Sequence, residues 1–205
     1  MVMEELTIIV SCYNQEKHLT ETIESILAQK VDFPIRVIIT DDYSQDRSKE
    51  IIREYEKKYS NIEAIFGHEN RGYLANILRA IEQTRTKYFY LLDSDDYWTD
   101  QHFLQSAYDY LETHEEYTIY EANVEVLSED GKNKHPFISP IIRTGTYSQE
   151  MLLSNKYVPI TQTTGMVLRN YIFANGIPEI MAKAVGTRSE RSFEGDTGRF
   201  IMHLK

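Results

Sequence analysis

The 205-residue sequence contains a single cysteine, Cys12, and no long apolar segment. One cysteine cannot form a disulfide within the chain, which is typical of a protein kept in a reducing compartment. The first residues, Met1 to Glu5, carry two acids and no basic stretch, unlike a secretory signal. No apolar run approaches the ~18–20 residues that span a bilayer. These absences predict a cytoplasmic chain.

Basic residues and glycines are also scarce. The 22 lysines and arginines stand against 32 aspartates and glutamates, a formal charge of −10. A nucleic acid binds through clustered basic residues, so we expect no nucleic-acid partner. Only nine glycines occur, and they form neither Gly-x-Gly-x-x-Gly nor Gly-x-x-x-x-Gly-Lys. The sequence therefore offers no dinucleotide-binding loop or P-loop to hold phosphates.

What the sequence does contain is an alternation of strand-like and helix-like segments. Short apolar runs cover residues 6–12, 35–40, 62–66 and 88–92, and apolar residues recur at helical spacing over 17–29, 51–55 and 74–81. This alternation predicts a parallel sheet with helices on its faces. With 41% hydrophobic residues, the chain has the composition of a globular domain with a buried core.

The pattern becomes less regular after Trp98. We expect a helix over about 100–113, a strand over about 117–127 and another strand over 163–168. The Asp130-Gly131 step indicates a turn.

Polar residues follow three of the apolar runs. Ser11 and Tyr13 end the first run, Asp41 and Asp42 follow the second, and Asp-Ser-Asp-Asp at 93–96 follows the fourth. Ligands of open parallel sheets bind outside the carboxyl ends of the strands, so these segments meet at one edge. Aspartate and serine are also good turn and capping residues. Two acidic clusters that end successive core strands nevertheless favour a cation, because neighbouring carboxylates repel one another without one.

An Asp-x-Asp sequence with oxygen ligands only suits Mg²⁺ or Mn²⁺, whose remaining positions are filled by substrate phosphates. Tyr13 offers a flat face on which a base can stack. A nearby carboxylate can accept the imino N–H that uracil has and cytosine lacks. Together these features predict a site for a metal-bound pyrimidine nucleotide.

Four motifs in this order closely resemble family-two glycosyltransferases with the GT-A fold. They are Ser-Cys-Tyr-Asn at 11–14, Asp-Asp-Tyr-Ser-Gln-Asp at 41–46, Asn-Arg-Gly at 70–72 followed by Asn76 and Arg-Ala-Ile at 79–81, and Leu-Asp-Ser-Asp-Asp-Tyr-Trp at 92–98. Each motif alone is weak, but the ordered set is specific and extends over nearly half of the chain. The resemblance implies an α/β, Rossmann-like GT-A fold: a mostly parallel sheet with helices on both faces and a smaller mixed acceptor-side region. It also implies a nucleotide-sugar-binding half, residues 1–98, and an acceptor-side half of the same catalytic domain, residues 99–205.

The resemblance assigns roles to individual residues of the donor site. Ser11 and Tyr13 match the nucleotide-binding loop, and Asp42 matches the carboxylate that accepts the base N3–H, with Asp41 in support. In the Asp-x-Asp motif, Asp93 matches the ribose and diphosphate contact, Ser94 lies between the acids, Asp95 matches the metal ligand, and Asp96 lies behind it. Arg71 and Asn76 match, more loosely, the approach to the donor sugar.

The resemblance places the catalytic base at Asp196. Family members carry an acidic pair or a Gly-Asp step at the start of a helix well after the Asp-x-Asp, and Glu194-Gly195-Asp196 fits this pattern. The alternative is that Asp196 only caps that helix.

We therefore predict a metal-dependent inverting glycosyltransferase that uses Mn²⁺ or Mg²⁺. It transfers a sugar from a UDP-sugar to a hydroxyl of a carbohydrate or lipid-linked glycan acceptor, as in cell-surface polysaccharide synthesis. Two alternatives stay open: a nucleotide-sugar-binding module without catalysis, and a sugar-phosphate nucleotidyltransferase, whose basic glycine-rich loop is missing here. The resemblance also implies a further C-terminal segment after Lys205, which allows peripheral association with the inner face of the membrane.

Overall fold

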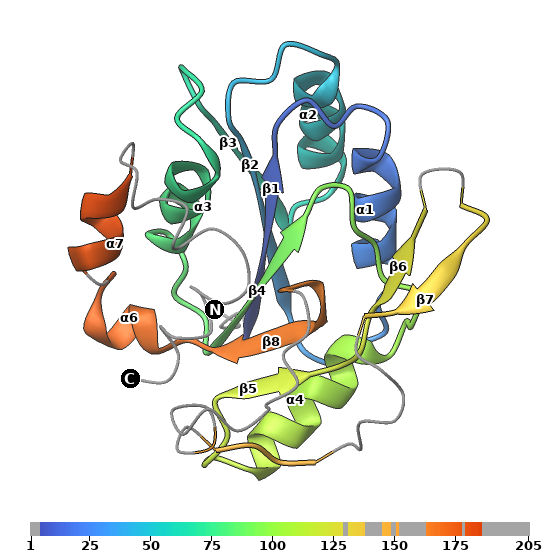
Figure 1. The fold of residues 1–205 in the computed structure, drawn as a ribbon. Helices are drawn as coiled ribbons and strands as arrows, with labels where there is room; N and C mark the ends of the chain where they lie inside the picture. Colours follow the sequence, from blue (N-terminus) through green and yellow to red (C-terminus); the bar gives the residue numbers. More distant parts are fainter. Residues whose placement is uncertain are drawn as a thin grey trace.

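The computed structural model describes residues 5–128, 131–137, 145–148, 151, 163–177 and 179–185. At its centre lies a six-stranded sheet with the order β3-β2-β1-β4-β8-β5 (Figure 1). The first four strands of the chain are parallel. They are β1 (Leu6–Cys12), β2 (Ile35–Asp41), β3 (Ile62–Phe66) and β4 (Tyr88–Asp93). The predicted parallel sheet is confirmed, because each apolar run forms a strand with nearly the expected bounds.

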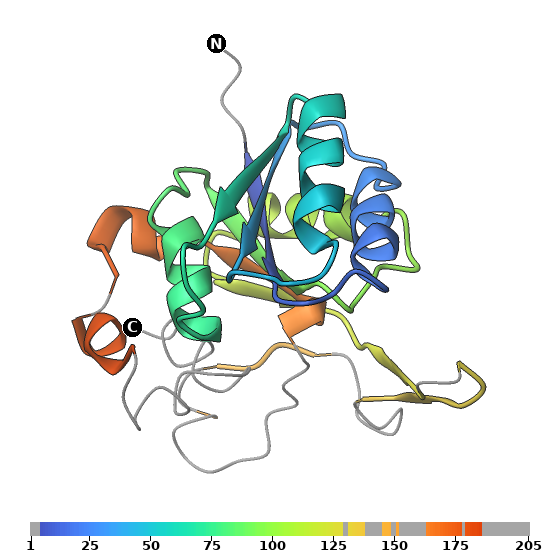
Figure 2. The same cartoon turned by 90° about the horizontal axis from the view of Figure 1, so that it is seen from above.

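Amphipathic helices cover both faces of this sheet. They are α1 (Leu19–Leu27), α2 (Ser48–Lys58), α3 (Tyr73–Ile81) and α4 (Phe103–Thr113). Successive side chains of a strand point to opposite faces, so Ile8 packs with α1, α2 and α4, whereas Ile9 packs with α3. Figures 1 and 2 show α1 and α2 on one face and α3 on the other. Strand β1 is therefore buried on both faces, as expected for the centre of a parallel sheet.

The sheet continues after residue 98 with strands of the opposite direction. Strand β8 (Met166–Arg169) pairs antiparallel with β4, and β5 (Ile119–Glu121) pairs antiparallel with β8. The division at residue 98 stays a prediction, and β5 and β8 extend the sheet that the earlier residues begin.

Two expected strands differ from the structure. The single strand over 117–127 is wrong, because it divides into β5 and β6 (Glu125–Leu127). Between them the Asn123 side chain accepts the Val124 N–H at 3.0 Å, a local hydrogen bond that competes with strand pairing. The strand expected over 163–168 begins later, because Thr163–Gly165 forms a 3-10 turn (η1) before β8.

Strand β6 pairs with β7 (Lys134–Pro136) in a separate hairpin that extends away from the sheet (Figure 2). Gly131, between these strands, has the positive φ of 66° typical of a glycine in a turn. Two short helices, α6 (Tyr171–Asn175) and α7 (Glu179–Ala184), follow β8. None of the helices formed by the described residues combines the length and apolarity needed to cross a bilayer.

Candidate active site

A pocket of about 430 Å³ lies where the parallel strands β1, β2 and β4 end. It brings together seven of the residues expected in the donor site: Ser11, Tyr13, Asp42, Asn76, Asp93, Ser94 and Asp95. Four further residues complete its lining: Gln15, Asn70, Gly72 and Tyr73. The expectation that three strand ends meet at one edge is borne out, because parallel strands place their carboxyl ends on the same side.

The carboxylate of Asp42 is buried at this pocket and is held by several hydrogen-bond donors. Asp42 is only 3% exposed. Its Oδ2 accepts the Gly72 N–H at 2.8 Å, and both of its oxygens lie within 3.2 Å of the Arg71 nitrogen. Its Oδ1 accepts a hydrogen bond from Arg79 Nη2 at 2.9 Å. Because Gly72 is the residue directly before α3, the negative charge also lies at the positive end of the helix dipole.

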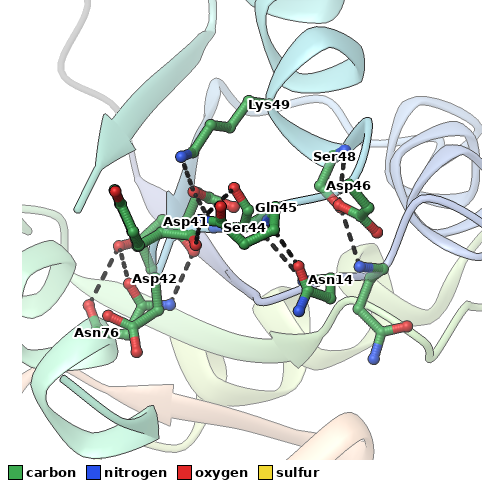
Figure 3. Close-up of polar contacts among 12 residues, drawn as sticks. Asn14, Asp41, Asp42, Ser44, Gln45, Asp46, Ser48, Lys49 and Asn76 are labelled. Carbon is green, nitrogen blue, oxygen red and sulfur yellow. Dashed lines mark hydrogen bonds and ion pairs between the residues drawn. The ribbon is translucent and has the colours of Figure 1, made fainter. Parts of the chain in front are cut away.

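The neighbouring Asp41 faces a different environment. It is completely buried, its Oδ1 accepts the Ser44 N–H at 3.0 Å, and Lys49 Nζ lies 4.0 Å from the same oxygen (Figure 3). Tyr43 has an exposed ring that lies under Lys49 and does not line the pocket. Asp42 therefore serves the pocket, whereas Asp41 holds the loop that follows β2.

The loops after β1 and β2 are joined to each other by side-chain hydrogen bonds (Figure 3). Asn14 has a φ of 53°, a left-handed conformation that asparagine adopts more readily than most residues. Its N–H donates to Ser44 Oγ at 2.9 Å, and its Oδ1 accepts the Gln45 N–H at 2.8 Å. These bonds hold the adjacent Tyr13, whose ring is 45% exposed at the pocket. Tyr13 thus offers an open aromatic face on a fixed loop.

Asp46 reinforces the same junction. It accepts the N–H groups of Glu16 at 2.9 Å and Ser48 at 3.0 Å. Partial burial acts to raise the pKa of Asp46. Hydrogen bonds from Ser48 and from backbone N–H groups outweigh this effect and lower that pKa below its usual value.

Cys12 ends β1 beneath these loops. Burial, helped by the nearby Asp41 charge, raises the pKa of its thiol to about 11. Cys12 is therefore a packed, protonated thiol at neutral pH, and not an activated nucleophile.

The acids after β4 are less enclosed. Asp93 is partly buried, and its Oδ1 accepts a hydrogen bond from the Tyr73 hydroxyl at 2.9 Å. Asp95 is exposed in the pocket. The two carboxylates can hold a cation in the same space as a bound diphosphate. Within the described ranges, no cluster of three or more histidine, cysteine, aspartate or glutamate side chains is arranged to hold a metal by itself.

Asp96 does not line the pocket and is bound by the second half of the chain. Its Oδ2 accepts a hydrogen bond from the Thr164 hydroxyl in η1. The Tyr90 hydroxyl donates to the Thr164 carbonyl oxygen and accepts the Trp98 Nε1–H at 2.9 Å. Burial holds the pKa of Tyr90 well above its usual value, so this hydroxyl stays protonated. The network joins the Asp-Ser-Asp-Asp segment to β8.

The remaining expected residues lie elsewhere. Arg71 contributes its backbone N–H to Asp42, while its side chain is exposed beside Glu69 and does not line the pocket. Asp196 and Glu194 lie outside the described residues. Sequence analysis missed Tyr73, although it directly follows the Asn-Arg-Gly motif, because its contact with Asp93 joins residues far apart in the chain.

The order of these motifs agrees with a known family. The model of the family described as glycosyl transferase family 2 matches residues 7–176. The chain belongs to this family. The GT-A fold expected of the family is confirmed by solved structures: S. aureus TarS 1–349 in complex with UDP gives a TM-score of 0.62 at 22% identity, over 86% of this chain and 51% of that one.

Curated relatives of this family 2 chain are found in several bacteria. The uncharacterised protein Rv1520 of Mycobacterium tuberculosis is 33% identical over 84% of this chain and 49% of its own length. The chain thus spans about half the length of this relative. A shorter match, 43% identical over 46% of the chain and 13% of the relative, is to the teichoic acid poly(glycerol phosphate) polymerase of Staphylococcus epidermidis.

Proposed function

We propose that the chain is the donor-binding and catalytic part of an inverting glycosyltransferase. It transfers a sugar from a UDP-sugar to a hydroxyl group of a glycan or lipid-linked acceptor in the synthesis of cell-surface polysaccharide. The observation that carries this proposal is the single pocket in which an open tyrosine face, a fixed carboxylate and the Asp-x-Asp acids meet.

The uridine assignment rests on Tyr13 and Asp42. The exposed Tyr13 ring provides a surface for stacking a base, and stacking alone does not select among bases. Asp42 supplies selectivity, because a carboxylate held by N–H donors stays a hydrogen-bond acceptor. The N3–H of uracil can donate to it, whereas N3 of cytosine is itself an acceptor.

The polysaccharide role is supported by the named activities of relatives. Besides the polymerase of Staphylococcus epidermidis, the putative teichuronic acid glycosyltransferase TuaG of Bacillus subtilis is 32% identical over 45% of the chain. UDP is also the ligand of the TarS structure that shares this fold.

The acids of the pocket fit a divalent cation. Asp93 and Asp95 line the same space, and within the described part of the chain no lysine or arginine side chain lines it. Mg²⁺ and Mn²⁺ are bound by one or two carboxylates together with substrate phosphates, so two acids without a closed cage suit them. We assign Asp95 as the metal ligand and Asp93 as the contact to ribose and diphosphate. When bound, the cation neutralises charge on the departing diphosphate.

The chain's own residues orient the donor and move one proton. Tyr13 and Asp42 hold the base, and Ser11 lies beside them in the pocket. In the proposed reaction the Asp196 carboxylate removes the proton of the acceptor hydroxyl as its oxygen attacks the anomeric carbon. The bond from that carbon to UDP breaks on the opposite face, so the configuration inverts and no covalent sugar–enzyme bond forms.

The experiment is to compare donor binding and sugar transfer in the wild type and in Asp196→Asn. An amide is nearly isosteric with a carboxylate but does not accept the proton at neutral pH. We expect Asp196→Asn to bind UDP-sugar as the wild type does and to lose transfer. A screen of UDP-, dTDP- and GDP-sugars with Mn²⁺ identifies the donor first.

Other outcomes of this experiment contradict the proposal. UDP-sugar binding without transfer by the wild type, over a panel of glycan and lipid-linked acceptors, favours a binding module without catalysis. Release of a nucleotide-sugar from sugar phosphate and UTP favours a nucleotidyltransferase. A product of retained anomeric configuration excludes a single displacement, and full activity in Asp196→Asn excludes Asp196 as the base.

A further inference from the structure

Arg79 lies behind the pocket and connects two of its residues. Its Nη2 donates to Asp42 Oδ1 and to Asn76 Oδ1, both at 2.9 Å. The guanidinium is 25% exposed and does not line the pocket itself. Arg79 therefore can act on a ligand only through the residues that it holds.

Asn76 extends this connection to the end of β1. It is buried; its Nδ2 donates to Ser11 Oγ at 3.2 Å and to the Thr40 carbonyl oxygen at 2.8 Å. Its Oδ1 also accepts a hydrogen bond from the Thr40 hydroxyl at 2.7 Å. Arg79 thus joins the ends of β1 and β2 to α3 through one buried polar network, in which removal of one member leaves others without partners.

Gly67, at the end of β3, leaves room for the guanidinium. A Cβ atom at Gly67 would lie 2.7 Å from Arg79 Nη1, 3.0 Å from Arg79 Nη2 and 3.1 Å from the Asp41 carbonyl oxygen. Gly67 is not among the glycines with positive φ, so alanine can adopt its backbone conformation. The guanidinium is the nearest of these groups and the end of a flexible side chain, so an added methyl group displaces chiefly Arg79 and presses less closely on the Asp41 carbonyl.

The position of the Asp42 carboxylate decides which base it accepts. A carboxylate has about four lone-pair positions, and here the Arg79 guanidinium and two backbone N–H groups already take several of them. A base can therefore donate only to a lone pair that these groups leave free. A carboxylate held in one orientation then accepts a hydrogen bond from N3–H of a pyrimidine stacked on Tyr13. A carboxylate that is free to move can instead reach the N4 amino group of cytosine.

We propose that Arg79 is a positioning residue that sets the selectivity for uracil over cytosine. Its guanidinium holds the Asp42 carboxylate in the orientation that accepts N3–H and disfavours the N3 lone pair of cytosine. This inference rests on the proposed function, because it takes a uridine nucleotide as the ligand of the pocket.

The test is to measure UDP and CDP affinities by calorimetry in Mn²⁺ for the wild type, Arg79→Met, Arg79→Lys and Gly67→Ala. We expect the wild type to prefer UDP. Arg79→Met and Gly67→Ala should lower that preference by about tenfold, the scale of one directed hydrogen bond to a charged group. Arg79→Lys should restore part of it, because an ammonium group keeps the charge but not the fork of donors.

Arg36→Met is the matched control. Arg36 lies near the start of β2, whereas Asp42 directly follows the end of that strand. The Arg36 guanidinium donates to both carboxylate oxygens of Glu63, at 2.8 and 2.7 Å. Its loss removes an arginine–carboxylate ion pair that lies away from the pocket. We expect Arg36→Met to keep the wild-type ratio of UDP to CDP affinity.

A purely structural role of Arg79 gives a different result. In that case Arg79→Met weakens UDP affinity and CDP affinity by the same factor, so the ratio of the two affinities stays unchanged. This result overturns the inference. If Arg79→Met does not fold, Gly67→Ala decides, since it keeps every hydrogen-bonding group. A wild type without preference for UDP contradicts the proposed base recognition itself, whereas a preference that survives in both variants contradicts only the role of Arg79.

Discussion

Two pairs of acids end parallel strands of the same sheet but differ in how far water reaches them. Asp41 and Asp42 after β2 are buried and receive N–H donors. Asp93 and Asp95 after β4 are partly buried and exposed, respectively, and both face the pocket. Aspartates at equivalent strand ends therefore lie in different environments: one pair is buried and the other is open to the pocket.

This difference separates two chemical tasks. A buried carboxylate surrounded by donors has a fixed orientation, which suits recognition of one hydrogen-bond donor on a base. A more exposed carboxylate loses less hydration of its charge and keeps its oxygen atoms accessible. These properties suit the binding of a cation that arrives with a substrate. Substitutions in the two pairs should therefore affect different properties of the protein.

The largest expected effect is on stability. Asp42→Ala leaves the Arg71 and Gly72 N–H groups and the Arg79 guanidinium without this acceptor, so we expect a loss of about 3 kcal/mol in the free energy of unfolding. Asp95→Ala removes an exposed side chain and should change that free energy by less than about 0.5 kcal/mol. Urea denaturation of both variants measures the contrast. Equal stability losses would mean that the two pairs do not differ as their burial indicates.

A smaller effect is expected at the aromatic side of the pocket. Tyr13→Ala should weaken UDP binding by roughly 2 kcal/mol, the scale of one base–aromatic stack. Tyr43→Ala is the control, because Tyr43 is an equally exposed tyrosine at the next strand end that does not line the pocket. Calorimetry of UDP binding to both variants shows which tyrosine stacks on the uracil base. An effect of Tyr43→Ala as large as that of Tyr13→Ala would place the base outside this pocket.

The parallel sheet and the pocket edge could be predicted because their signals are local. Each strand from β1 to β4 is a short apolar run, and the acids lie at the ends of β2 and β4 or directly after them. The topology of parallel strands then brings these acids together without any knowledge of their contacts.

Features that depend on distant contacts could not be predicted in this way. Arg79 belongs to a motif of the sequence, but its role could not be predicted because its partner Asp42 lies 37 positions earlier. The place of β8 in the sheet also could not be predicted, because this strand has only four residues. Its position between β4 and β5 depends on its pairing with both of them. The role of Asp196 stays a prediction, because that residue lies outside the described part of the chain.

The most direct test of the donor site is UDP binding to the wild type, with Mn²⁺ or with EDTA, measured by calorimetry. We expect EDTA to weaken UDP at least about tenfold, or about 1.4 kcal/mol, because no fixed lysine or arginine side chain of the described residues lines the pocket. Asp95→Asn should bind UDP weakly under both conditions, whereas Asp109→Asn, an exposed acid of α4, should behave as the wild type. Equal UDP affinity of the wild type in Mn²⁺ and in EDTA would contradict a donor site completed by a divalent cation.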